Sequence, residues 1–260
     1  MAVPRHRIGN RSAVTLTSPV DGRVMFVIPG GDQAIVGTTD TFTTESPDHV
    51  RTTEADVDYL LASANVYFPD AKLSADDVVA AWSGIRPLAS APPGTDPSSI
   101  SREHHIDVGA NGVITVSGGK LTTYRSMAEE AVDELVSFLG MPKTECRTAT
   151  EELPGGDRNA RRAALESDDP ELARSVLHGL AYTCSDVALA ADEEMAVTLS
   201  DVMVRRTHIA FELSDHGAGT VHSVARVMAG VLGWDGATTR SRIADYADDV
   251  NRLFSFRGSS

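Results

Sequence analysis

The sequence predicts an α+β protein in two parts. Residues 1–150 should form an antiparallel or mixed β-sheet with packed helices, and residues 151–260 a small all-α domain. Three observations support this division: β-branched runs between turn residues fill the first part, only helical periodicity follows it, and "LPGGD" (153–157) is a linker-like stretch between the two.

The first strands are predicted around a turn. "AVTLTS" (13–18) and "RVMFVIP" (23–29) flank Pro19-Val20-Asp21-Gly22, and Asp-Gly is a strong hairpin signal. "AIVGTTD" (34–40) is a candidate third strand. We therefore expect this region to begin with an antiparallel sheet.

A long helix and a shorter one should follow. Thr53 can cap the first, with Asp56 in the capping-box position. Apolar residues then recur at helical spacing: Val57, Leu60, Leu61, Ala64 and Phe68. The second, in 74–88, starts at a cap-like Ser74 and becomes extended by Gly84, because Pro87 disfavours helix at the residue before it.

A loop, a hairpin and a helix complete the first part. "APPGTDPSS" (91–99) is loop-like, and "HHIDV" and "GVITV" flank the turn at residues 109–112. After Gly118-Gly119-Lys120, apolar residues recur on one helical face until Gly140 and Pro142 stop the helix. Those residues are Tyr124, Met127, Ala128, Ala131, Val132, Leu135 and Leu139.

The second part reads as helical throughout. Asp169-Pro170-Glu171 offers a cap, a first-turn proline and a first-turn carboxylate, which together favour a helix start. Helical periodicity predicts five segments: 157–166, 170–179, 190–206, 219–232 and 238–254.

Composition excludes several classes of protein. No stretch reaches the roughly 20 apolar residues of a membrane span, and the first residues lack the apolar core of a secretory signal. Cys146 and Cys184 are the only cysteines, so a disulfide framework, a thiolate zinc site and an iron–sulfur cluster are not expected, and we predict no metal site. A net charge of −14 argues against nucleic acid as a partner.

The charge is built from arginine and short carboxylates. Lysine occurs three times, at Lys72, Lys120 and Lys143, against twenty arginines, and aspartate outnumbers glutamate. Such a surface repels itself at low ionic strength and is screened by salt, which predicts adaptation to a high-salt cytoplasm; an acidic protein without that adaptation is the alternative. With lysine so scarce, Lys120 beside two glycines is a candidate functional residue.

The Gly118-Gly119-Lys120 turn is the first candidate site. A helix that begins directly after a strand directs its unpaired N–H groups and its positive dipole end beyond the strand. The P-loop pattern fails, because Ile114 replaces its first glycine and Leu121 follows the lysine where Ser or Thr is needed. A group that becomes negative during a reaction, such as a reducible ring, fits better. The alternative is a tight turn whose glycines serve packing alone.

Arginines and histidines supply the other candidates. In "WSGIRPL" (82–88), Arg86 stands between an extended backbone and a proline, and its guanidinium suits a carboxylate or phosphate; a salt bridge is the alternative. "SREHH" (101–105) adds Arg102 and two histidines, one of which could transfer a proton near neutral pH.

Several of these stretches together resemble one family. "DGRVMFVIP", "IVGTTD", "WSGIRPL", "SREH" and "VSGGKLTTYR", followed by "LPGGD" and "ADEEMAVTLSDVMVRRT", resemble the FAD-dependent, quinone-linked glycerol-3-phosphate dehydrogenases in order and spacing. The resemblance covers nearly the whole chain. Members open with a GxGxxG turn that holds the ADP half of FAD, and that motif is absent here. The resemblance therefore implies the substrate-binding and C-terminal portion only, with the Rossmann-like FAD domain largely missing.

The resemblance also implies roles for individual residues. Arg86 would hold the substrate near the flavin, Lys120 would lie at both substrate and flavin, and Arg102 would be a weaker substrate-orienting residue. The helix start facing the flavin ring would consist of Gly118, Gly119, Lys120, Leu121, Thr122 and Thr123. Helix N–H groups there would stabilise the anionic reduced flavin.

The implied activity is oxidation of sn-glycerol 3-phosphate to dihydroxyacetone phosphate, with electrons passed to quinone. The implied setting is a cytoplasmic protein, with a homodimer and a peripheral position on the inner face of the cell membrane as further expectations. FAD binding by this chain alone should be weak or absent. Two alternatives stay open: a noncatalytic partner-binding module without FAD, and a flavin-dependent amino-acid or amine oxidase.

Overall fold

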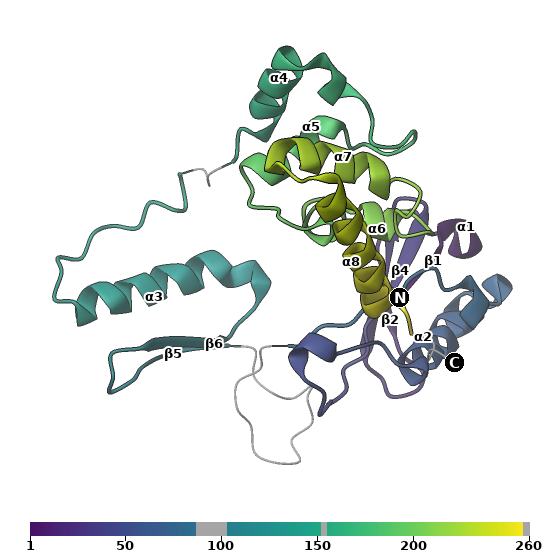
Figure 1. Ribbon diagram of the computed structural model, residues 1–260. Coiled ribbons are helices and arrows are strands. Elements are labelled where there is room, and N and C mark those ends of the chain that lie inside the picture. The colour runs from purple at the N-terminus through teal and green to yellow at the C-terminus, as the bar shows by residue number, and fades with distance from the viewer. Residues whose placement is uncertain (87–102, 152–154, 257–260) are drawn as a thin grey trace. The chain divides into compact units, whose positions relative to one another are not determined.

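The computed structural model describes residues 1–86, 103–151 and 155–256, and these form two compact units (Figure 1). Unit 1 comprises Met1–Thr39, Glu45–Gly84 and Arg158–Ser260, and unit 2 comprises Asp40–Thr44 and Ile85–Asp157. Each unit contains an antiparallel sheet and at least one helix, so the predicted α+β class is confirmed. The division near residue 150 stays a prediction.

Unit 1 begins with a four-stranded antiparallel sheet. The strands are β1 (Ala2–Pro4), β2 (Val14–Thr17), β3 (Val24–Gly30) and β4 (Gln33–Gly37), in the order β1-β4-β3-β2. Leu16 pairs with Met25 and Val27 with Val36, so alternate residues of three strands share one face. That face is buried, whereas Val24, Phe26 and Ile28 on the opposite face of β3 are exposed.

Helix α2 (Glu54–Tyr67) covers the buried face of this sheet. Thr53 and Asp56 form the predicted capping box, with Asp56 N–H donating to the Thr53 hydroxyl and the Asp56 carboxylate accepting from Thr53 N–H. Val57, Leu60, Leu61 and Ala64 pack into the core beneath the strands.

Helix α1 (Arg5–Ile8) packs with Ile8 against the sheet core. The helices that follow α2 in unit 1 are grouped around a second core. They are α4 (Arg158–Asp168), α5 (Cys184–Asp192), α6 (Ile209–Glu212), α7 (Val221–Leu232) and α8 (Gly236–Phe254), together with a π-helical segment at Asp201–Arg206. Leu199, Met203, Ile209 and Met228 are almost fully buried at its centre.

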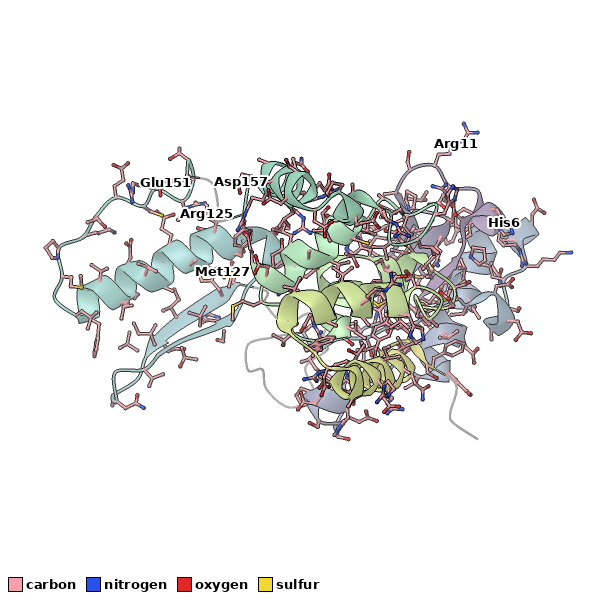
Figure 2. The ribbon with its side chains drawn as sticks, turned by 45° about the horizontal axis from the view of Figure 1, so that its top comes forward. His6, Arg11, Arg125, Met127, Glu151 and Asp157 are labelled. Carbon is pink, nitrogen blue, oxygen red and sulfur yellow. The ribbon has the colours of Figure 1, made fainter. Side chains whose placement is uncertain are left out.

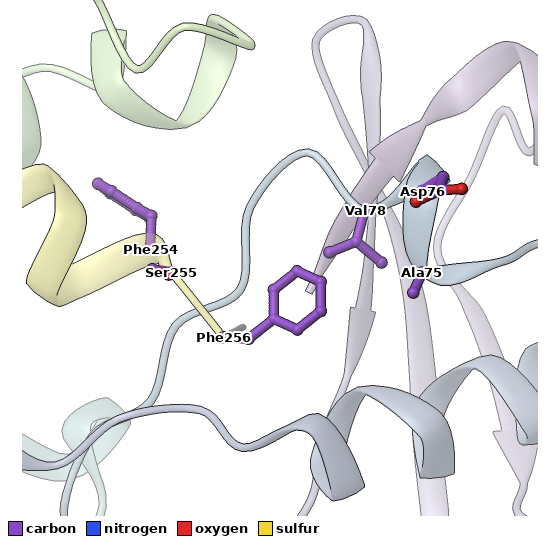
Figure 3. A pocket seen from close by; sticks show the side chains of 6 residues that line it. All are labelled: Ala75, Asp76, Val78, Phe254, Ser255 and Phe256. Carbon is purple, nitrogen blue, oxygen red and sulfur yellow. The ribbon is translucent and has the colours of Figure 1, made fainter. Parts of the chain in front are cut away.

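The end of α8 joins this helical core to the sheet. Phe254 packs with Ala2, Ala80 and Ala210, and the Phe211 ring lies edge-on to it at 5.1 Å between centroids. Two residues later, Phe256 is directed toward Val78 at a shallow cavity of about 200 Å³ and packs against the sheet core (Figure 3). The C-terminal segment therefore contacts both cores.

Unit 2 is a hairpin and one helix. Strands β5 (His104–Val108) and β6 (Ile114–Gly118) pair antiparallel, and α3 (Tyr124–Phe138) follows after a 3₁₀ turn at Leu121–Thr123. Within the described part of the chain, no residue of α3 is buried. The predicted hairpin and helix are confirmed; the predicted loop at 91–99 lies outside the described residues.

Two predicted helices of the second part are wrong. In 170–179, only a 3₁₀ turn at Pro170–Ala173 forms, because the chain then doubles back through Gly179, with φ +95°, and Ser175 bridges to Thr183. In 190–206, α5 ends at Asp192, and the chain becomes helical again only after Thr198, leading into Asp201–Arg206. Thr198 and Asp201 form capping bonds there, a start signal within the predicted helix.

Three smaller differences concern the first part. The short β1 was not predicted, although its backbone pairs with β4. The third strand stops at Gly37 rather than Asp40. In 74–88, the predicted helix is a single 3₁₀ turn at Ala75–Asp77, because the Asp77 carboxylate caps Ser74 and the following residues run in extended conformation toward the bridge at Ala80.

Candidate functional site

Arg86 is held by an ion pair within unit 2. Its guanidinium lies 2.8 Å from the carboxylate of Asp40, at the end of the "IVGTTD" stretch. The Asp40 side chain is 16% exposed and that of Arg86 36% exposed, so the pair is only partly shielded from solvent. The salt bridge that the sequence left as the alternative is therefore present. It leaves other guanidinium N–H groups as donors for an anion.

Asp40 is the residue that sequence reasoning missed at this position. The signal was present: an arginine fixed by a neighbouring proline, in a chain of net charge −14, is expected to find a carboxylate. What the sequence could not supply was which of 37 carboxylates lies beside it, because residues 40 and 86 are brought together only by tertiary folding.

The two glycines of the strand–helix turn are required by the chain itself. Gly118 and Gly119 have φ of +73° and +86°, a region that favours glycine. A Cβ at Gly118 would lie 2.5 Å from the Glu103 carbonyl oxygen, and one at Gly119 would lie 2.5 Å from the Met127 sulfur. Close packing, the alternative reading of these glycines, accounts for both of them without any ligand.

The residues after the glycines form an exposed helix tip. Lys120, Leu121, Thr122 and Thr123 are all solvent-exposed, Leu121 by 89%. Thr123 N–H and its hydroxyl both donate to the Lys120 carbonyl, which closes the 3₁₀ turn. Among the described residues, the N–H groups of Lys120, Leu121 and Thr122 have no recorded acceptor. Three backbone donors and the positive end of α3 are therefore open at one place.

The Lys120 ammonium adds a charge to this tip. Among residues 1–86, 103–151 and 155–256, no carboxylate lies within 4.0 Å of it. The other lysine of unit 2, Lys143, does have such a partner, because its ammonium lies 2.7 Å from Asp133 and the hydrogen bond raises its pKa. Lys120 thus remains available to an anion.

Polar and packing contacts tie the hairpin to α3. His104 Nε2 lies 2.7 Å from a Glu130 carboxylate oxygen, and Met127 lies against Gly119. Figure 2 shows Met127 on the side of α3 that faces the hairpin, whereas Arg125 lies on the other side. His104 is therefore engaged by a carboxylate, and His105 on the opposite strand face is exposed. A proton-transfer role for either histidine stays a prediction.

The predicted site residues are only partly brought together. Gly118 to Thr123 form one continuous tip, and no hydrogen bond links Arg86 to them within the described part of the chain. Arg102 lies outside the described residues. The described residues contain no group of three or more His, Cys, Asp or Glu side chains arranged to hold a metal ion, and no helix among them is long and apolar enough to cross a membrane.

Two family models match the chain. Residues 2–125 match "FAD dependent oxidoreductase", and residues 156–239 match "C-terminal domain of alpha-glycerophosphate oxidase". The first match includes Arg86 and the helix tip, and the second covers α4 to the start of α8.

Curated relatives agree with these models. "Glycerol-3-phosphate dehydrogenase 2" of Mycobacterium tuberculosis is 32% identical over an alignment of 278 residues, gaps included, and the alignment covers 95% of this chain and 47% of the relative. "Glycerol-3-phosphate dehydrogenase" of Synechocystis sp. is 32% identical over 270 residues, covering 90% of this chain and 49% of the relative. The chain thus spans about half the length of these relatives.

A solved structure shares the fold. The glycerol-3-phosphate dehydrogenase from Bacillus halodurans complexed with FAD matches 100% of this chain and 57% of its own chain, with a TM-score of 0.78 and 27% identity.

Proposed function

The chain belongs to the family of FAD-dependent glycerol-3-phosphate dehydrogenases, and on this premise we propose that it supplies the substrate-facing and C-terminal portion of such an enzyme. The proposed reaction is oxidation of sn-glycerol 3-phosphate to dihydroxyacetone phosphate. When bound, FAD would accept a hydride from the C2 carbon of the substrate.

The observation that carries this proposal is the exposed tip of α3. A reduced flavin carries negative charge, and the tip offers three unpaired N–H groups, a helix dipole and the unpaired Lys120 ammonium. These donors fit an electron-rich edge of FAD. The two glycines give no independent support, because the chain's own packing requires them.

Arg86 is proposed to hold the anionic end of the substrate. Its pairing with Asp40 restricts the guanidinium to one position before substrate arrives, which lowers the entropy lost on binding. Asp40 then acts as a positioning residue. Arg102, predicted as a weaker substrate contact, remains part of the proposal on resemblance alone.

A chimera tests the function. The chain would replace its matching portion of the Bacillus halodurans enzyme, and reduction of a dye acceptor would be followed with glycerol 3-phosphate, an amino acid or an amine as donor. We expect turnover with glycerol 3-phosphate only. Turnover with an amino acid or amine would favour the oxidase alternative, and absence of the flavin band in a folded chimera would favour the noncatalytic module.

Variants separate the residue roles in that chimera. Arg86→Ala should raise KM by about tenfold to a hundredfold, with the flavin band retained, because a charged hydrogen bond to substrate is lost. Lys120→Ala should lower kcat and alter the flavin spectrum. Asp40→Asn should raise KM by a smaller factor than Arg86→Ala, because the guanidinium remains but is less well positioned.

We propose quinone as the electron acceptor, a cytoplasmic protein that associates peripherally with the inner face of the cell membrane, and a homodimer. FAD binding by the chain alone should be weak or absent, and a tightly held flavin in the purified chain would contradict this. Urea unfolding at low and at molar salt tests the proposed salt adaptation, which predicts a clear gain in stability with salt.

A further inference from the structure

A cleft of about 720 Å³ lies within unit 1, remote in sequence from the residues assigned to FAD and substrate. Its walls are the end of α4 with the 3₁₀ turn after it, one face of α5 and one face of α7, which appear together in Figure 1. Its volume falls in the range of sites for small organic ligands, about 300–1,000 Å³.

Helical spacing explains how the cleft is built. From α5, Cys184, Ala188 and Asp192 recur every four residues, so they share one face. On α7, Arg226 and Gly230 are four residues apart, as are Val227 and Val231, so these four residues also share one face. The apolar members of these faces, together with Leu165 and Leu172, give the cleft a hydrocarbon-compatible wall.

Two arginines supply the positive charge. Arg174 is paired with its neighbour Glu171 at 2.8 Å, but Arg226 has no carboxylate within 4.0 Å among the described residues. Both guanidiniums act on the Cys184 thiol: burial raises the pKa of that thiol, and the two arginines partly oppose the rise. Both arginines, and Glu171, which raises the pKa of the thiol, therefore act on Cys184 within the cleft.

Three carboxylates also line the cleft, and Arg226 is the lining cation that none of them pairs with among the described residues. The Asp169 carboxylate accepts a hydrogen bond from Glu171 N–H and caps the 3₁₀ turn. Glu171 pairs with Arg174, and Asp192 is exposed at the last residue of α5. None of the three is recorded in contact with Arg226.

Gly230 is an exposed residue of α7 that lines the cleft. Glycine destabilises a helix interior relative to alanine, and here no heavy atom lies within 4 Å of the position a Cβ would take. No neighbouring atom of the described residues therefore requires a glycine at position 230. It opens space that a ligand can use.

We propose that this cleft binds an amphiphilic organic anion, with a phosphate or carboxylate group between Arg226 and Arg174 and a hydrocarbon portion along Gly230, Val227 and Leu165. The site is independent of the proposed dehydrogenase activity, because none of its residues belongs to the helix tip or the Arg86–Asp40 pair.

Calorimetric titration of the full chain tests the ligand class with four probes below their micellar concentrations. Octyl phosphate and octanoate carry both features, inorganic phosphate only the charge, and octanol only the tail. We expect saturable binding of at least one amphiphilic anion, at least about tenfold tighter than phosphate or octanol. The tighter of the two anions identifies the headgroup. Equal binding of octanol or of phosphate, or no saturation at all, would overturn the proposal.

Variants locate the binding in the cleft. Arg226→Gln should weaken binding about tenfold through loss of a charged contact. Gly230→Leu should weaken it by filling the tail space, without any change of charge and with a better helix former in place. Arg242→Gln, an equivalent charge change on α8 outside the cleft, is the matched control and should leave affinity unchanged. Unaltered binding in both cleft variants would refute the assignment.

The two cysteines provide an internal control that does not depend on any variant. Cys184 lines the cleft, whereas Cys146 lies in unit 2 beside Thr148. Saturating octyl phosphate or octanoate, whichever binds more tightly, should slow disulfide-reagent labelling of Cys184 several-fold and leave Cys146 unaffected. Equal slowing of both thiols, or none at Cys184, would contradict a ligand in this cleft.

Discussion

Unit 1 and unit 2 differ in what they bury. Every buried apolar residue among those described belongs to unit 1, where three clusters form under the sheet, among the helices and at the end of α8. Unit 2 contributes none, although it carries many large apolar side chains at its surface. They include Val108, Val113, Val116, Leu121, Tyr124, Val132, Leu135, Phe138, Leu139 and Met141.

The difference shows that good local signals do not make a core. Helix α3 is amphipathic, and its hairpin forms in the expected register, yet Val132, Leu135 and Phe138 remain more than 40% exposed. A helix of this pattern is stabilised mainly by burial of its apolar face. Because these apolar side chains stay exposed, we expect unit 2 to be less stable than unit 1.

The largest predicted effect comes from truncating one apolar side chain in each unit, buried in unit 1 and partly exposed in unit 2. Met228→Ala in α7 removes a fully buried side chain and should lower the free energy of unfolding by about 2–5 kcal/mol. Leu135→Ala in α3 should change it by less than about 0.5 kcal/mol, because that side chain is already 43% exposed. Guanidinium unfolding measures both. Comparable losses in the two variants would show that unit 2 has a core of its own.

The next effect concerns one threonine at the N-cap position of a helix in each unit. Thr183 caps α5 in a box with Asp186, whereas Thr123 at the start of α3 makes no capping bond with its side chain. Thr183→Ala should therefore cost about 1–2 kcal/mol of unfolding free energy, and Thr123→Ala close to zero. Thermal and denaturant melts of the two matched variants check this. A larger loss from Thr123→Ala would reverse the comparison.

These two units also show what the sequence could and could not predict. Elements with a complete local signal were predicted well: the Thr53–Asp56 box, the β5–β6 hairpin, and α7 and α8 lie where periodicity and caps place them. Errors arose where a second start signal competed, as at Thr198, or where a glycine turn reversed the chain, as at Gly179.

For the candidate site, sequence reasoning found the segments but not their contacts. Lys120 was singled out by its rarity and does lie exposed at a helix tip. The partner of Arg86 was not identified, because an ion pair between residues 40 and 86 depends on tertiary folding. For the glycines, the sequence left a ligand and close packing as alternatives. Their positive φ and the Glu103 carbonyl beside Gly118 account for them by packing, and no local pattern reveals that contact.

A pH effect of intermediate size sharpens the description of unit 1. Burial tends to raise the pKa of Asp249, but hydrogen bonds from Arg252 and Ser200 outweigh it, and the pKa is lowered overall. A carboxyl group with a lowered pKa in the fold contributes stability above its ordinary pKa of about 3.9. That contribution is lost as the pH falls through the lowered value.

Asp249→Asn should therefore cost about 1 kcal/mol at pH 7 and progressively less in acid. Urea unfolding of the variant and the parent between pH 7 and pH 3 measures the difference. Asp245→Asn, whose longer pair with Arg242 is more exposed, is the control and should change stability little at either pH. A difference between Asp249→Asn and the parent that stays constant down to pH 3 would show that this carboxylate does not stabilise unit 1 through its charge.

The smallest effect is expected at the polar contact that ties the hairpin of unit 2 to α3. His104 and Glu130 lie 2.7 Å apart, but the Glu130 side chain is 54% exposed, and exposed pairs contribute only about 0–1 kcal/mol. Glu130→Gln should lower amide-exchange protection in β5 and the start of α3 no more than severalfold. Glu129→Gln breaks an ion pair with Arg125 on the same helix and is the control, because it leaves the hairpin contact intact.

If Glu130→Gln alone abolished protection throughout unit 2, the fold of unit 2 would depend on this one polar contact. Its exposed apolar face would then no longer explain why unit 2 is the weaker part of the molecule.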